Sequence, residues 1–111
     1  MNKLATVLAA SLLCLSTTVF AETHLDQAIE HANAAVVEGK AGKTPELAVH
    51  AKAALDHSLA ASLVAKSVSK NHIDAASKSL QDSIDHAGLN HAGPATSSAE
   101  EAVIHLNAAK K

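Results

Sequence analysis

Eight histidines dominate the chemistry available to this chain, and they fall into four pairs with a fixed spacing. The two members of each pair are seven or fourteen residues apart. The pairs are His24 with His31, His50 with His57, His72 with His86, and His91 with His105. Neutral imidazole is a good ligand for Zn²⁺, Cu²⁺ and Ni²⁺. A single histidine on a helix is more often an ordinary surface residue, but eight on one shared spacing indicate metal ligands.

Three acidic residues, Glu46, Asp82 and Glu101, lie four positions before a histidine, which is one helical turn back on the same face. Two imidazoles with a carboxylate form a ligand set that suits Zn²⁺, Cu²⁺ or Ni²⁺. A carboxylate–histidine pair at this spacing is equally consistent with a simple hydrogen bond along the helix. We therefore predict eleven metal ligands: the eight histidines and these three carboxylates.

The first twenty-one residues have the features of an export signal. A charge at Lys3 precedes an apolar run from Leu4 to Leu15, and Val19-Phe20-Ala21 is a cleavage site of the small-x-small type. Cys14 raises the alternative of a lipoprotein signal, but Leu13 stands where such signals need a small residue. We expect cleavage after Ala21, a mature domain of residues 22–111, and no membrane attachment after cleavage.

The composition of the predicted mature chain excludes several classes of site. It contains no Cys, Met, Trp, Tyr or Phe, so disulfides, thiolate sites and dedicated Cu⁺ sites are not expected. It has eight Lys, eleven Asp and Glu, and no Arg, which argues against nucleic acid and anionic lipid as partners. No base accompanies Ser97-Ser98 in a recognisable catalytic motif, so we do not expect an enzyme.

Helical periodicity divides the rest of the chain into four segments. We predict helices at about 23–38, from 44 to about 67, from after 71 to near 88, and from about 94 to 109. Thr23 is the predicted cap of the first helix, and Thr44 followed by Pro45 the predicted start of the second. The start of the fourth is open, because Ser97 is an alternative to Gly93-Pro94.

A shift of 48 residues relates the two halves of the chain. It superposes His24 on His72, His57 on His105 and Asp26 on Asp74. An internal repeat with aligned helix boundaries indicates two helical hairpins, at about 23–67 and 71–109. Short connections make neighbouring helices antiparallel, so we predict an all-α, up-down-up-down four-helix bundle. Its many alanines favour helix but bury little area, so the core should be thin.

The histidines should flank this core and pair between helices. Within one helix, seven residues span roughly 10 Å, too far for two imidazoles to share one ion comfortably. Mirror symmetry about each turn pairs His24 with His57, His31 with His50, His72 with His105, and His86 with His91. The same symmetry pairs Ser79 with Ser98 and Glu38 with Lys43.

His24 has a second possible role. Cleavage after Ala21 would leave Glu22-Thr23-His24 as the N-terminus. The amine, two amide nitrogens and the imidazole then form a square-planar N₄ set, a geometry that selects Cu²⁺ or Ni²⁺. His24 cannot serve this site and a cross-helix pair at the same time.

The segments HLDQAIEH, HAKAALDH and AEEAVIHL, with the glycine-rich turns, resemble the small metal-binding protein family. The resemblance covers Thr23 to about Ala108. It implies a bacterial periplasmic protein whose histidine-rich helical bundle binds several divalent metals, Cu²⁺ among them. That family is denser in histidine, and four positions here depart from its pattern: Ser79, Ser98, Glu38 and Lys43.

We therefore expect a monomeric periplasmic protein that buffers or sequesters divalent metal. The Irving–Williams order places Cu²⁺ first, with Ni²⁺ or Zn²⁺ behind it. The alternative is a periplasmic stress or chaperone-like protein with pH-sensitive histidines. It would need an exposed apolar patch, for which the chain offers few large apolar residues.

Overall fold

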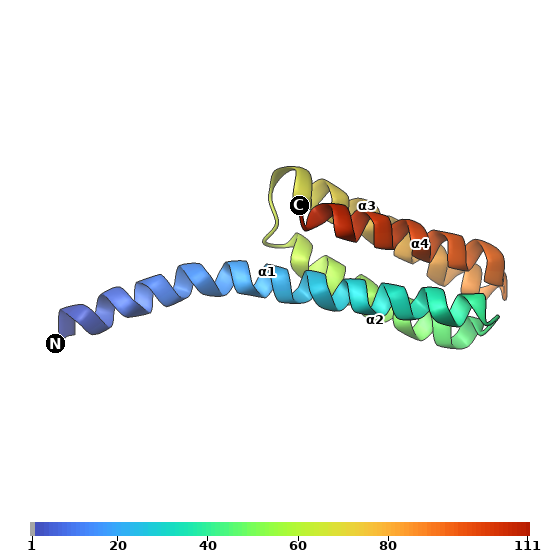
Figure 1. Cartoon of the computed structure of the whole chain (residues 1–111), viewed down its shortest axis with the longest axis horizontal. Helices are drawn as coiled ribbons and strands as arrows, with labels where there is room; N and C mark the ends of the chain where they lie inside the picture. The colour runs from blue at the N-terminus through green and yellow to red at the C-terminus, as the bar shows by residue number, and fades with distance from the viewer. Residues whose placement is uncertain (1) are drawn as a thin grey trace.

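The computed structural model describes the backbone of residues 2–111 and the side chains of residues 19–111. It contains four helices: α1 (Asn2–Lys40), α2 (Thr44–Ser62), α3 (Ser67–Gly88) and α4 (Ala92–Ala109). The N-terminal part of α1 projects beyond the other three helices (Figure 1). The side chains of most of the predicted export signal lie outside the described residues. None of the described helices combines the length and hydropathy that a membrane span requires.

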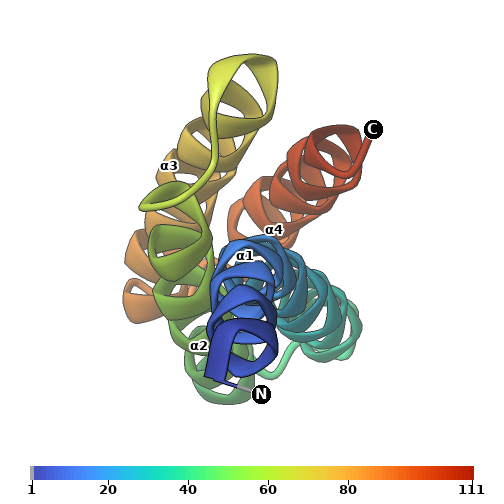
Figure 2. The same ribbon diagram turned by 90° about the vertical axis from the view of Figure 1, so that its left-hand side faces the viewer.

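The four helices form a bundle of two antiparallel hairpins, as the repeat predicts. Contacts join α1 to α2 and α3 to α4 within the hairpins, and α2 to α3 and α1 to α4 between them. The view along the bundle shows the helices arranged around a common interior (Figure 2). The prediction of an all-α four-helix bundle is confirmed.

Small side chains fill the interior. Twelve of the seventeen buried apolar residues within 19–111 are alanines. The large side chains that are fully buried are Leu47, Ile73, Leu80 and Leu106. An alanine core lets helices approach closely, but it removes less apolar area from water than a leucine core would. Its contribution to stability is correspondingly modest.

The turns within the two hairpins have the same backbone hydrogen bonds. In the first, the N–H of Lys43 donates to the Glu38 carbonyl at 2.9 Å, and that of Gly42 to Gly39 at 3.0 Å. In the second, the equivalent bonds join His91 to His86 at 2.9 Å and Asn90 to Ala87 at 3.0 Å. This is the Schellman motif, which requires a left-handed residue at its C′ position. Gly42 (φ 76°) and Asn90 (φ 59°) supply it.

Two of the predicted caps are wrong. Thr23 lies inside α1, because the preceding residues continue the same helix in the uncleaved chain. Thr44 does not cap α2: Lys43 is the N-cap residue, and no side chain bonds there. The Thr44 hydroxyl instead donates to Asn90 Oδ1 at 2.7 Å, which joins the turns of the two hairpins. The start of α4 at Ala92 also places Ser97 inside a helix.

The connection between the hairpins is earlier than predicted, since α2 ends at Ser62 and α3 begins at Ser67. Side-chain hydrogen bonds bridge this connection. Ser62 donates to Asp74 Oδ1 at 2.5 Å, and Lys70 Nζ donates to Asp74 Oδ2 at 2.9 Å. The hydrogen bond from Ser62, followed by that from Lys70, lowers the pKa of Asp74. Asp74 therefore joins α3 to the end of α2 through hydrogen bonds.

Asp26 occupies the equivalent position in the first hairpin and makes a further contact between the hairpins. Its Oδ1 accepts a hydrogen bond from Lys110 Nζ at 2.6 Å. This bond to Asp26 raises the pKa of Lys110. The repeat thus places one carboxylate on α1 facing the end of α4, and one on α3 facing the end of α2.

Gly39 marks the closest approach between the first hairpin and α4. A Cβ there would overlap Thr96 Oγ1 and lie 2.7 Å from Leu47 Cδ1 and 3.0 Å from Thr96 Cβ. We expect Gly39→Ala to lower the free energy of unfolding by about 1–3 kcal/mol in a denaturant titration, because overpacking outweighs alanine's helix propensity. Gly93→Ala is the control, since nothing lies within 4 Å of that Cβ. Equal stability of the two variants would contradict the close approach.

Candidate metal centre

The histidines lie at the flank of the core because of their position in the helical repeat. Seven of the eight directly precede a buried residue, as His24 precedes Leu25 and His105 precedes Leu106. A residue one step before a core position lies about 100° around the helix from it. These seven side chains are consequently half-buried, whereas His91, in the second turn, is exposed. Their imidazoles remain open to solvent on one side.

Three of the expected cross-helix pairs are within direct contact. The Nδ1–Nδ1 distance is 3.0 Å between His24 and His57, and 3.4 Å between His31 and His50. In the second hairpin, the same distance between His72 and His105 is 3.5 Å. We call the four histidines between α1 and α2 the first seam, and the four of the second hairpin the second seam.

These distances match those between two nitrogens bound to one ion. Metal–nitrogen bonds of about 2.0–2.1 Å place cis ligands of a square-planar ion about 2.9 Å apart, and ligands of a tetrahedral ion about 3.4 Å apart. Two imidazoles this close share one proton, with one Nδ1 as donor and the other as acceptor. A divalent ion can bind between the two Nδ1 atoms when the donor ring carries its proton on Nε2 instead, and this needs no large movement of either helix.

The fourth pair, His86 and His91, has a different origin. The two residues are held by the Schellman turn, in which the His91 N–H donates to the His86 carbonyl at 2.9 Å. Their ring centroids are 6.4 Å apart, the longest separation of the four pairs. His86 Nδ1 is buried and has no hydrogen-bond partner. This pair therefore places a nitrogen without a hydrogen bond, His86 Nδ1, at the turn of the second hairpin.

The first seam contains a contact that mirror symmetry does not anticipate. The rings of His31 and His57 are parallel within 9°, with centroids 5.7 Å apart. The corresponding separations are 5.2 Å for His24–His57 and 5.6 Å for His31–His50. The four imidazoles thus alternate between α1 and α2 at nearly equal steps, in the order His24, His57, His31, His50. The helical stagger of the two antiparallel helices, which residue numbers alone do not fix, produces this order.

The surroundings of His57 disfavour the charged form of its imidazole. Burial, followed by the charges of His24 and His31, lowers its pKa below the ordinary value, against an opposing effect from Asp56. Each cause disfavours the imidazolium form. His57 is therefore available as a neutral ligand to lower pH than an unperturbed histidine.

The three predicted carboxylate ligands differ in their surroundings. Glu101 Oε1 lies 3.9 Å from His105 Nε2, as the spacing along α4 suggests. Asp82 accepts a salt bridge from Lys78 at 3.2 Å, so one of its oxygens is already paired. Glu46 is exposed on the first turn of α2. Within residues 19–111, no three histidine or acidic side chains lie close enough together to hold one ion. The donor set that the structure presents is a pair of imidazoles.

The second seam is interrupted at its centre. Ser79 and Ser98 occupy the positions equivalent to His31 and His50, and Ser79 is buried. The turn of the first hairpin carries Glu38 and Lys43 where the second carries His86 and His91. The first seam therefore has four consecutive imidazoles, whereas the second has two separate pairs.

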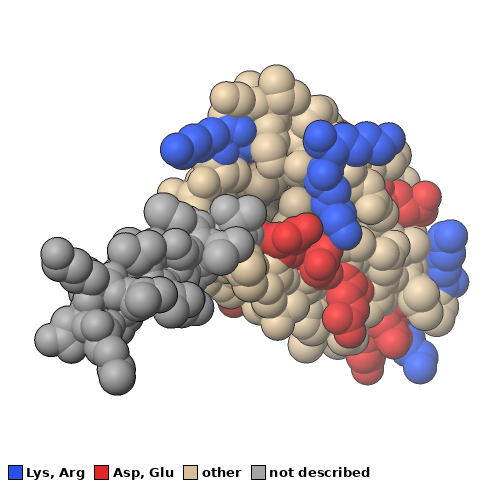
Figure 3. Space-filling model, turned by 60° about the vertical axis from the view of Figure 1, so that its left-hand side comes forward, with Lys and Arg blue, Asp and Glu red and all other residues tan. Residues whose placement is uncertain are grey.

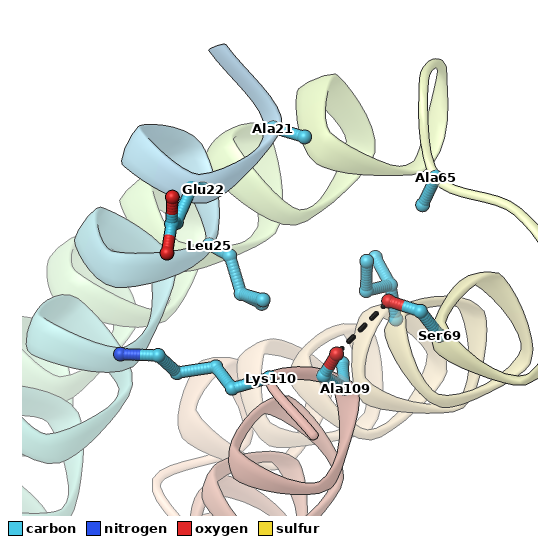
Figure 4. A pocket seen from close by; sticks show the side chains of 8 residues that line it. Ala21, Glu22, Leu25, Ala65, Ser69, Ala109 and Lys110 are labelled. Carbon is cyan, nitrogen blue, oxygen red and sulfur yellow. Dashed lines mark hydrogen bonds between the residues drawn. The ribbon is translucent and has the colours of Figure 1, made fainter. Parts of the chain in front are cut away.

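The cavity at the open end of the bundle is distinct from the histidine seams. It has a volume of about 250 Å³ and lies where α1 passes the ends of α3 and α4 (Figure 4). Its walls include Leu25 and Ile73, and Ser69 donates to the Ala109 carbonyl at 3.0 Å beside it. No histidine lines this cavity. On the face in Figure 3, most of the acidic side chains form a continuous stripe from the middle of the face to its lower edge, and basic side chains lie mainly above it and to its right.

A comparison with protein families also indicates metal binding. The model of a family described as "Small metal-binding protein" matches residues 1–109. The chain belongs to the small metal-binding protein family. A comparison with curated proteins gave no match. Membership of this family supports metal binding in general, and its description names no reaction.

Proposed function

We propose that this protein binds divalent transition metal ions between pairs of histidines on neighbouring antiparallel helices, and so buffers or sequesters them. The observation that carries the proposal is the Nδ1–Nδ1 distance of 3.0–3.5 Å in three separate pairs. Cu²⁺ is the preferred ion by the Irving–Williams order, with Ni²⁺ and Zn²⁺ behind it. Solvent completes the coordination, and Glu101, which lies 3.9 Å from His105 Nε2, orients that imidazole through the nitrogen that faces away from His72.

Calorimetric titration with Cu²⁺ tests this proposal. We expect the wild-type protein to bind up to four ions, one for each pair, and a variant with all eight histidines changed to alanine to lose this binding. Alanine is a strong helix former, so circular dichroism should show the helices retained. A matched control changes Lys43, Lys52, Lys66 and Lys78 to alanine and keeps every histidine. Equal Cu²⁺ binding by the wild-type and eight-histidine variants would refute the proposal.

The proposed place of action is the periplasm, after removal of residues 1–21. In the uncleaved chain, the backbone of Glu22, Thr23 and His24 is part of α1, and the ring of Phe20 packs edge-on to His24 with centroids 4.2 Å apart. Cleavage would remove Phe20 and free the amine that the alternative N₄ site needs. N-terminal sequencing of the exported protein tests the cleavage point. Adding one residue before Glu22 would abolish the N₄ site and leave the cross-helix pairs intact.

The chaperone-like alternative has one observation in its favour. A groove of about 230 Å³ between α1 and α4 is lined by Val36, Val103 and Ile104, and 68% of the surface of Ile104 is exposed. Protection of an unfolded client protein in the presence of a chelator would support this alternative. Protection that needs metal, or none at all, would favour the metal-binding function.

A further inference from the structure

We infer that His31 and His57 form a metal-binding pair of their own, diagonal to the pairs that mirror symmetry defines. This inference rests on the proposed function, because it assumes that two neighbouring imidazoles suffice to hold an ion. It adds a site to the first seam that overlaps the His24–His57 and His31–His50 sites. The first seam is then a continuous array rather than two discrete sites.

The geometry of the three neighbouring ring pairs in the first seam supports this inference. The centroid separation for His31–His57, 5.7 Å, differs from that of His31–His50 by 0.1 Å (5.7 against 5.6 Å). It equals the separation of His72 and His105, whose Nδ1 atoms are 3.5 Å apart. The parallel rings of His31 and His57 need only rotate about their side-chain torsions to point a nitrogen at a common ion. The two residues lie on different helices. They are therefore not kept apart by the roughly 10 Å that separates two histidines seven residues apart on one helix.

Sharing of ligands has a consequence for how ions occupy the seam. Each ion needs two imidazoles, so four histidines hold two ions at most, and only in the two outer pairs. An ion in the diagonal pair uses His31 and His57 and leaves His24 and His50 without a near partner. A single ion can pass from one pair to the next while keeping one imidazole bound, since adjacent pairs share a residue. The maximum number of ions is the same with or without the diagonal pair, so stoichiometry of the wild-type protein does not reveal it.

The second seam has no diagonal pair of imidazoles. Its diagonal position pairs His105 with Ser79, the residue equivalent to His31. A serine hydroxyl is a much weaker ligand for these ions than an imidazole. The repeat therefore provides two seams of similar backbone geometry, of which only the first allows an ion to shift between overlapping pairs.

Double substitutions distinguish metal binding by the diagonal pair from metal binding by the two pairs that mirror symmetry defines, which we call the discrete pairs. They are made in the uncleaved chain, where Glu22 has no free amine, with His72, His86, His91 and His105 already changed to alanine. His24→Ala with His50→Ala leaves only His31 and His57. The matched control, His31→Ala with His57→Ala, also removes one histidine from each helix but leaves only the two ends of the array. Both combinations break both discrete pairs.

Zn²⁺ binding to these variants is measured by calorimetry, with His24→Ala/His57→Ala, which keeps the His31–His50 pair, as reference. We expect the diagonal variant to bind one Zn²⁺ within about tenfold of the reference affinity and at least about tenfold more tightly than the control, because two ligands held together bind better than two held apart. If the diagonal variant binds no better than the control while the reference binds one ion, the inference is overturned and the proposed function stands. If the reference itself binds no ion, the cross-helix pairing on which both rest is overturned.

Discussion

Saturating Cu²⁺ is expected to raise the melting temperature of this protein by more than about 10 °C, because each ion stabilises only the folded state. One site at a free concentration of 100 times its dissociation constant contributes about 2.7 kcal/mol. Each kcal/mol corresponds to roughly 4–8 °C in a domain of this size. The alanine-rich core provides little stability of its own, so the effect of metal should be large in proportion.

Thermal unfolding followed by circular dichroism measures this shift. A chelator should reverse it, and the variant with all eight histidines changed to alanine should show none of it. Because three of the pairs join two helices of one hairpin, binding holds α1 to α2 and α3 to α4. A melting temperature that does not respond to Cu²⁺ would contradict binding between helices, even if ions bound elsewhere on the chain.

Acidification from pH 7.5 to pH 5.5 is expected to weaken Cu²⁺ binding by about two orders of magnitude per pair. Only neutral imidazole binds metal, and an ordinary histidine pKa is about 6.5. Two protons must leave for each ion that binds, so the apparent affinity falls by about tenfold per imidazole at one pH unit below the pKa. Calorimetry at a series of pH values measures the change.

The surroundings of His57 lower its pKa, so protons compete less well for this imidazole than for an ordinary histidine. NMR titration of the His57 ring in the metal-free protein measures this shift. Titration of His57 at or above the ordinary value would contradict the surroundings described for it.

In the metal-free protein, the lowered pKa of His57 makes the fold less stable in acid. The unfolded chain binds a proton at His57 more readily than the folded chain, so the free energy of unfolding falls as pH drops below about 6.5. Asp74 acts in a separate window. Its pKa is also lowered, so the stabilising contribution of its bonds is present above about pH 4 and is lost as pH falls through the lowered value.

The fold could be predicted because the signals were repeated and periodic. The apolar stripe, the 48-residue repeat and the short glycine-containing turns all indicate the same pair of hairpins. Helix starts were less predictable, because a residue such as Thr44 has several possible hydrogen-bond partners. Its hydroxyl bonds to Asn90 of the other hairpin, a contact that depends on how the hairpins pack and not on the neighbouring sequence.

The pairing of the histidines could also be predicted, because it follows from the same repeat. Mirror symmetry about each turn identifies which histidines face one another, since it depends only on residue number. It does not give the stagger of α1 against α2, because that depends on how the buried side chains of the two helices pack. The contact between His31 and His57 is a result of that stagger. The spacing of Glu46, Asp82 and Glu101 likewise places each on a helix face without showing which neighbour the carboxylate binds.

X-ray absorption at the zinc or copper edge tests the central claim most directly. With one ion bound per chain, we expect scattering from two imidazole rings at about 2.0–2.1 Å, with the remaining ligands supplied by oxygen. The signal should disappear in the variant with all eight histidines changed to alanine. A bound ion surrounded by oxygen alone, or by one imidazole only, would contradict metal binding between paired histidines.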